Sequence, residues 1–110
     1  MSDESIQEKL EKVRQSYIAS LDEKRKTIAR DWASLKENWD EDTYENMYMV
    51  IHGIAGSAET FGFPELTQQA RNVIDQLKKT NSTRPDTSLE NNIDREILGI
   101  LAIIKKFSKS

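Results

Sequence analysis

The side chain best suited to chemistry in this chain is its single histidine, His52. An imidazole nitrogen that carries no proton is a nucleophile near neutral pH and can accept a phosphoryl group. Metal-dependent bundle enzymes need several inward glutamates and an ExxH pair, which this sequence lacks, and the absence of cysteine excludes a Cys-ligated metal. Neither GxxxxGK[ST] nor GxGxxG occurs, so we expect no ATP binding and no cofactor.

The position of His52 on a helix predicts an exposed ring. At about 100° per residue, it is turned a quarter of a circle from the apolar stripe through Ile51. Its neighbours one turn away are Tyr48, Ala55 and Gly56, of which the last two are too small to cover the imidazole. The alternative is an ordinary solvated or packed histidine, with Gly56 serving only to admit the next helix.

Two helices joined by a tight turn should hold this residue. The first should start near residues 40–43 and run to about Thr60, and Gly62 should end it. Pro64 suits the first turn of the next helix, and the short connection predicts an antiparallel hairpin. The buried positions of the two helices are predicted to be Met47, Ile51, Ile54, Ala58, Phe61, Leu66, Ala70, Val73 and Leu77.

In that hairpin His52 lies level with residues 71–75 of the second helix. Arg71 and Lys78 share one flank of it, together with Thr67 and Ile74. Either cation could stabilise a negatively charged oxygen near the histidine, although both could equally be solvated surface charges.

The other apolar residues recur at helical spacing, which predicts an all-α fold in one domain spanning residues 1–110. Residues 5–38 could form one helix or two, with capping boxes at Ser5 with Glu8 and at Ser20 with Glu23. A polar loop at residues 80–87 precedes the last helix. The core positions predicted in these segments are Ile6, Leu10, Val13, Tyr17, Leu21, Ile28, Trp32, Leu35, Trp39, Leu89, Ile93, Ile97, Ile100, Leu101, Ile104 and Phe107.

The segment from His52 to Gly62, HGIAGSAETFG, closely resembles the phosphoacceptor motif of histidine-phosphotransfer (HPt) domains. The resemblance implies an antiparallel four-helix bundle, here with an additional N-terminal helix from Ser5 to about Ala19. It also implies that His52 accepts a phosphoryl group and exchanges it with the aspartate of a response-regulator receiver domain. Many members carry a lysine three residues after the histidine, where this chain has Ala55.

Partners and roles follow from the same resemblance. Receiver domains and a sensor or hybrid histidine kinase are the expected partners, and the magnesium is expected on the receiver. The chain would be a phosphohistidine intermediate and not an autonomous kinase. We expect the docking surface to comprise Tyr48, Ala55, Gly56, Glu59, Arg71 and Lys78.

Composition and charge argue against several other classes of protein. A net charge of −3 argues against nucleic-acid binding, and the sequence has neither a secretion signal nor a membrane-spanning run. We therefore expect a cytoplasmic monomer, either free-standing or excised from a hybrid kinase. The alternatives are a docking module that is never phosphorylated, and a membrane-surface or coiled-coil helix protein, which leaves the HGIAGSAETFG segment unexplained.

Overall fold

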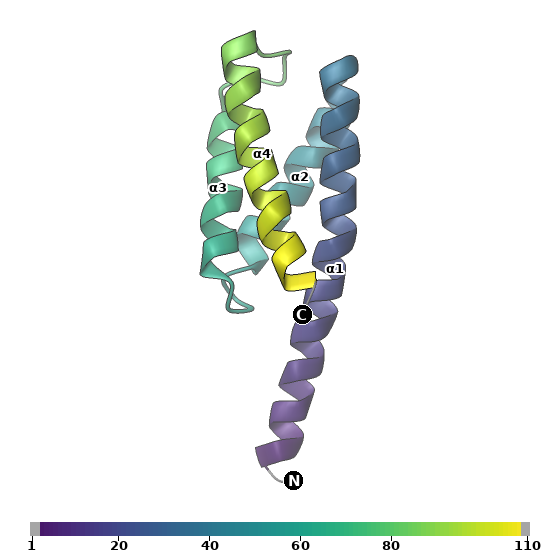
Figure 1. Ribbon diagram of the computed structural model, residues 1–110, viewed down its shortest axis with the longest axis vertical. Helices are drawn as coiled ribbons and strands as arrows, with labels where there is room; N and C mark the ends of the chain where they lie inside the picture. The colour runs from purple at the N-terminus through teal and green to yellow at the C-terminus, as the bar shows by residue number, and fades with distance from the viewer. Residues whose placement is uncertain (1–2, 109–110) are drawn as a thin grey trace.

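The computed structural model describes residues 3–108, and within them it has four helices and no strand. Each helix packs on two neighbours, in the cyclic order α1, α2, α3, α4 and back to α1 (Figure 1). This arrangement confirms the all-α four-helix bundle. The helices are α1 (Asp3–Glu37), α2 (Glu41–Ser57), α3 (Pro64–Lys78) and α4 (Thr87–Ser108).

Helix α1 is continuous over 35 residues, so the additional helix expected at residues 5–19 is the first half of α1 and not a separate element. Neither glycine nor proline interrupts this stretch. Ser5 and Glu8 lie inside the helix, which begins at Asp3. The capping box expected at Ser20 and Glu23 is also wrong, because the Ser20 hydroxyl donates to the Tyr17 carbonyl at 2.7 Å within an unbroken helix.

The N-terminal part of α1 projects beyond the other helices (Figure 1), and the molecule is 57 Å long but only 22 by 20 Å across. The predicted burial of this part is therefore wrong. Ile6, Leu10 and Val13 are 50%, 64% and 52% exposed, because no other helix reaches far enough to cover them. Burial begins at Tyr17, which is 7% exposed.

The core lies between the four helices and contains most of the other residues predicted to be buried. Trp39, Phe61, Leu89, Leu101 and Phe107 are only partly buried, at the edges of this core. The structure adds Tyr44, Phe63 and Ile74 to the buried set. Predicted core residues that are buried are Tyr17, Leu21, Ile28, Trp32, Leu35, Met47, Ile51, Ile54, Ala58, Leu66, Ala70, Val73, Leu77, Ile93, Ile97, Ile100 and Ile104.

Local signals set the ends of α2 and α3. The Asp40 carboxylate accepts from the Thr43 backbone N–H at 2.9 Å and caps α2, as Asp commonly does. Helix α2 ends at Ser57, three residues earlier than expected, and turns follow up to Gly62, whose φ of 87° suits glycine. Pro64 then opens α3.

Polar contacts between helices fix their register. The Trp32 indole N–H donates to the Asp94 carboxylate at 2.8 Å, and Lys36 adds a second bond at 3.1 Å. The buried Tyr44 hydroxyl donates to the Leu77 carbonyl at 2.9 Å, which joins α2 to the end of α3. A buried donor without such a partner would be destabilising, so these bonds favour one alignment of the helices.

Candidate functional site

The His52 side chain is exposed on α2, with the flanking position that its spacing predicts. Its ring stacks on Tyr48 one turn earlier, with ring centres 6.2 Å apart and planes inclined by 14°. No hydrogen bond or ion pair reaches the imidazole from the residues that the structure describes. Both ring nitrogens are therefore available to solvent or to a docking protein.

His52 lies at a shallow concave surface between α2 and α3, which we call the histidine groove. Helix α2 contributes His52, Ala55 and Gly56, and helix α3 contributes Arg71, Ile74, Asp75 and Lys78. The volume of the groove is about 300 Å³. The antiparallel hairpin thus brings the histidine level with residues 71–75, as predicted, and Arg71 and Lys78 face its side of the helix. Thr67 does not share that exposed flank, because it is buried and bonded to Phe63.

The two cations of the groove have different surroundings. An Arg71 guanidinium nitrogen lies 3.9 Å from a Glu59 carboxylate oxygen, and both side chains are more than half exposed. Ion pairs of this kind contribute little to stability, on the order of 0–1 kcal/mol, so Arg71 can exchange partners readily. Lys78 has no ion pair with any described residue. It also borders a second, adjoining groove that Tyr44 and Tyr48 line.

Asp75 is a groove residue that the sequence analysis did not select. It follows Arg71 by four positions and therefore lies on the same flank of α3. The four-residue spacing from Arg71 could therefore have predicted from the sequence that Asp75 lies in the groove.

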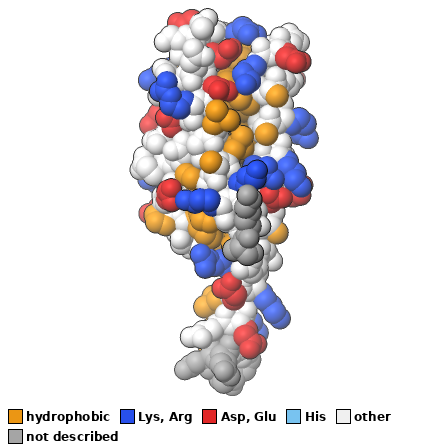
Figure 2. Space-filling view, in the orientation of Figure 1, with side chains coloured by type: hydrophobic (Ala, Val, Ile, Leu, Met, Phe, Trp, Pro, Cys, Tyr) orange, Lys and Arg blue, Asp and Glu red, His pale blue; other side chains and the backbone are white. Residues whose placement is uncertain are grey.

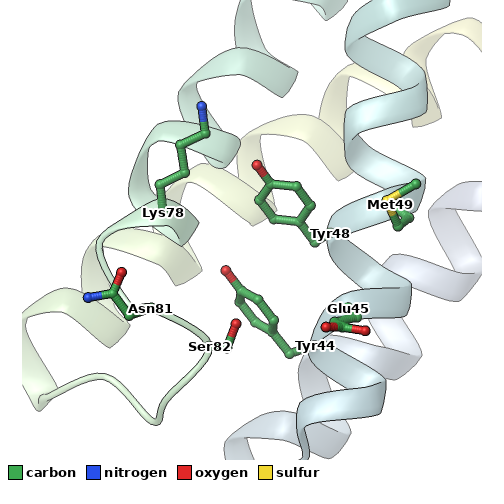
Figure 3. Close-up of a pocket in the computed structure, with 7 residues that line it drawn as sticks. All are labelled: Tyr44, Glu45, Tyr48, Met49, Lys78, Asn81 and Ser82. Carbon is green, nitrogen blue, oxygen red and sulfur yellow. The ribbon is translucent and has the colours of Figure 1, made fainter.

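A second hollow, the tyrosine groove, adjoins the histidine groove. Tyr44 and Tyr48 extend from α2 toward Lys78 and the loop after α3, while Met49 lies at the other edge (Figure 3). Met49 is 65% exposed. Lys78 borders both hollows, and Tyr48 joins them through its stacking on His52. The full lining is Tyr44, Glu45, Tyr48, Met49, Lys78, Asn81 and Ser82.

Sequence reasoning missed this second groove because loop conformation completes it. Asn81 and Ser82 have φ angles of 49° and 65°, which few residues other than glycine adopt. The Trp39 indole N–H donates to the Ser82 carbonyl at 2.9 Å and holds the loop against the bundle. Only the four-residue spacing of Tyr44 and Tyr48 could have indicated this groove from the sequence.

The small residues beside His52 leave open space. A Cβ atom placed on Gly53 or Gly56 would meet nothing within 4 Å, so neither glycine is required for helices to approach. This finding contradicts the alternative that Gly56 serves to admit the next helix. Alanine would stabilise a helix interior by about 1 kcal/mol at each position, so the open surface is kept at a cost in helix stability.

Comparison with protein-family models identifies the family of this chain. The family model described as Hpt domain matches residues 6–102, which is most of the chain. The chain belongs to the Hpt domain family. Comparison with curated proteins gave no significant match, and neither did comparison with solved structures.

As a member of this family, the chain is a phosphotransfer module of two-component signalling. Proteins of the family interact with kinases and receiver domains. In the described part of the chain, no helix is long and apolar enough to cross a membrane. The same residues contain no group of three or more His, Cys, Asp or Glu side chains that could hold a metal ion.

Proposed function

We propose that this Hpt domain accepts a phosphoryl group on His52 and exchanges it with the aspartate of a response-regulator receiver domain. The observation that carries the proposal is the exposed, unbonded imidazole of His52 at a groove with two cationic side chains. In this role the protein would act in the cytoplasm, with a sensor or hybrid histidine kinase upstream.

The reaction needs little from this chain beyond a correctly placed nucleophile. An unprotonated ring nitrogen of His52, by family analogy Nε2, attacks the phosphorus in line with the bond to the aspartate oxygen. The N–P bond forms while the P–O bond breaks, and the electron pair of that bond returns to the receiver carboxylate. The reverse sequence passes the group on. The receiver would supply the magnesium ion and the acidic residues.

Arg71 and Lys78 would neutralise the phosphoryl oxygens. The family lysine three residues after the histidine is Ala55 here, so positive charge must come from elsewhere. Both cations line the groove on the α3 side of the ring. Arg71 would leave its exposed partner Glu59 for the more highly charged phosphoryl group, to which charge-assisted bonds are stronger.

The histidine and tyrosine grooves together form the surface on which we propose that the receiver docks. The small side chains of Ala55 and Gly56 permit close approach, and the exposed Met49 and the partly exposed Tyr48 supply apolar contact. Charged side chains, including Glu59 and Arg71, border this apolar area. Such a surface suits brief encounters, in which charge selects the partner more than it adds affinity.

The loss of the lysine at Ala55 favours one competing function, a docking module that binds a receiver but carries no phosphoryl group. Incubation with a panel of phosphorylated receiver domains separates the two. The carrier function predicts a label on this chain that is stable in alkali, labile in acid and absent from His52→Gln. Binding without a label in the wild type would support the docking module instead.

A further inference from the structure

We propose that two copies of this chain pair through the projecting part of α1, in antiparallel orientation. The stem is defined here as residues 5–16. Ile6, Leu10 and Val13 of each copy would pack against the stem of the other. The proposal goes beyond phosphotransfer and does not depend on it.

The stem has an apolar stripe that no other described residue of the chain covers. Residues 6–16 are all exposed, and three of the five exposed large hydrophobic residues among those described lie here. Figure 2 shows the stem as a narrow extension below the bundle, with charged side chains on the visible face. Most of the stability of a helix in a protein comes from packing of its apolar face, which the stem lacks among the described residues. A partner for the stripe would supply that packing.

The spacing of the stripe suits a second helix of the same kind. Ile6, Leu10, Val13 and Tyr17 are separated by four, three and four residues, the alternation of a and d positions in a coiled coil. The segment is about 18 Å long, at 1.5 Å per residue. An identical stem offers a stripe of the same length and period.

Charges next to the stripe select the orientation. In a parallel pair, Lys9 would lie beside Arg14 of the second copy on both sides of the contact, and the like charges would repel. In an antiparallel pair, Lys9 lies beside Ser16 of the second copy and Arg14 beside Gln7. Only the antiparallel arrangement avoids repulsion along both edges.

The base of the bundle provides a suitable end for the contact. In antiparallel register, Leu10 faces Val13 of the second copy, and Ile6 comes level with its Tyr17. Tyr17 stacks on Phe61, with ring centres 4.1 Å apart, and lies beside Phe63. Tyr17 and Phe63 are only 7% and 4% exposed, and the Arg14 guanidinium lies 4.9 Å from the centre of the Phe63 ring, so the contact would end at the charged edge of this cluster and not on its ring faces.

The pairing should be weak, because the contact is smaller than the roughly 1,600 Å² of a standard stable interface. This proposal departs from the monomer that the sequence analysis expects. His52 lines the histidine groove between α2 and α3 and is not part of the stem.

Sedimentation over a concentration series tests the pairing. The average mass of the wild type should rise toward that of a dimer, and Leu10→Gln should weaken association at least tenfold. Leu98→Gln is the matched control, because Leu98 is 59% exposed on α4 against 64% for Leu10. A wild type that stays monomeric at millimolar concentration overturns the proposal, and so does an equal loss in the control.

Cysteine cross-linking tests the orientation, and the chain has no native cysteine to interfere. A mixture of Leu10→Cys and Val13→Cys should form the mixed disulfide in preference to either homodimer. Ile6→Cys alone should not cross-link, because its two copies would lie far apart. Ready cross-linking of Ile6→Cys would indicate a parallel pair and contradict the proposal. Binding of the stem to anionic vesicles without any self-association would also overturn it.

Discussion

The imidazole of His52 faces two cations across the histidine groove, and these cations should differ in how they act. Arg71 forms an ion pair with Glu59 and would exchange it for the more highly charged phosphoryl group, whereas Lys78 lies between the two grooves. The sequence could place both on one flank of α3, because residues spaced by seven share a helix face. It could not show the ion pair to Glu59, which depends on the exact turn between α2 and α3.

Removal of either cation should slow phosphoryl transfer. We expect Arg71→Ala and Lys78→Ala each to lower the rate by about tenfold, corresponding to roughly 1.4 kcal/mol of transition-state stabilisation. Lys79→Ala is the matched control, because Lys79 is exposed but does not line the groove. Rapid-quench kinetics with a phosphorylated receiver measures the effect. Unchanged rates in both groove variants would contradict the role of these cations.

Away from the site, Asp94 should make stability depend on pH. The indole N–H of Trp32 is the main cause that lowers the pKa of Asp94 below its ordinary value, and Lys36 adds to the effect. Folding therefore favours the charged form, so this contribution is present above the ordinary carboxyl pKa of about 3.9 and is lost as the pH falls through the lowered pKa.

Asp94→Asn should accordingly lose less free energy of unfolding than the wild type between about pH 5 and pH 2. Urea denaturation across this range measures the difference. Trp32→Phe removes the principal donor and should reduce the pH dependence in the same direction. Equal acid sensitivity in all three proteins would show that the Trp32 to Asp94 bond does not stabilise the charged carboxylate.

At the scale of elements, α2 carries both the core stripe and the open surface. Its start, three of its four buried positions and the direction of His52 followed from helical periodicity, whereas the buried Tyr44 was missed and the end was placed three residues too late. The sequence left two roles open for Gly56, an uncovered surface beside His52 or close packing of the next helix, and the empty space beside Gly56 contradicts the second.

The two glycines of α2 offer a matched pair for a test. Gly53→Ala and Gly56→Ala should each raise the free energy of unfolding by about 0.5–1 kcal/mol, since alanine favours the helix. Only Gly56→Ala should slow phosphoryl transfer, because Gly56 lines the histidine groove and Gly53 does not. Thermal unfolding and transfer kinetics on both variants separate the effects. An equal loss of rate in both would contradict the role of the groove.

Helix α1 shows where periodicity alone misleads. The same apolar spacing runs from Ile6 to Leu35, but only the part from Tyr17 onward is buried. The other three helices have 17, 15 and 22 residues against 35 in α1, so they cannot cover its full length. The extent of burial is thus a property of helix lengths and of the alignment of helices, which the stripe itself does not encode.

Paired substitutions can check this boundary. Leu21→Ala should cost about 2–5 kcal/mol, because Leu21 is fully buried in the core. Leu10→Ala should cost less than about 0.5 kcal/mol at low protein concentration, because its exposed side chain leaves no cavity when it is shortened. Urea denaturation of both variants gives the comparison. A large loss for Leu10→Ala in the dilute protein would contradict the exposed position of the stem.

At the scale of the whole molecule, the proposed phosphotransfer surface is separate from the projecting stem. The bundle and the place of the histidine were predictable from apolar patterning and the HGIAGSAETFG motif. The tyrosine groove and the exposed stem were not, because one depends on loop geometry and the other on which helices are long enough to reach.

The most direct test of the account is the fate of a phosphoryl group placed on the protein. The wild type would be phosphorylated with phosphoramidate, the modified residue located by tandem mass spectrometry, and the product mixed with receiver domains. We predict a single phosphoryl group on His52 that is lost from this chain as a receiver gains it on aspartate. A phosphoryl group on His52 that no receiver accepts, or transfer that persists in His52→Gln, would contradict the account.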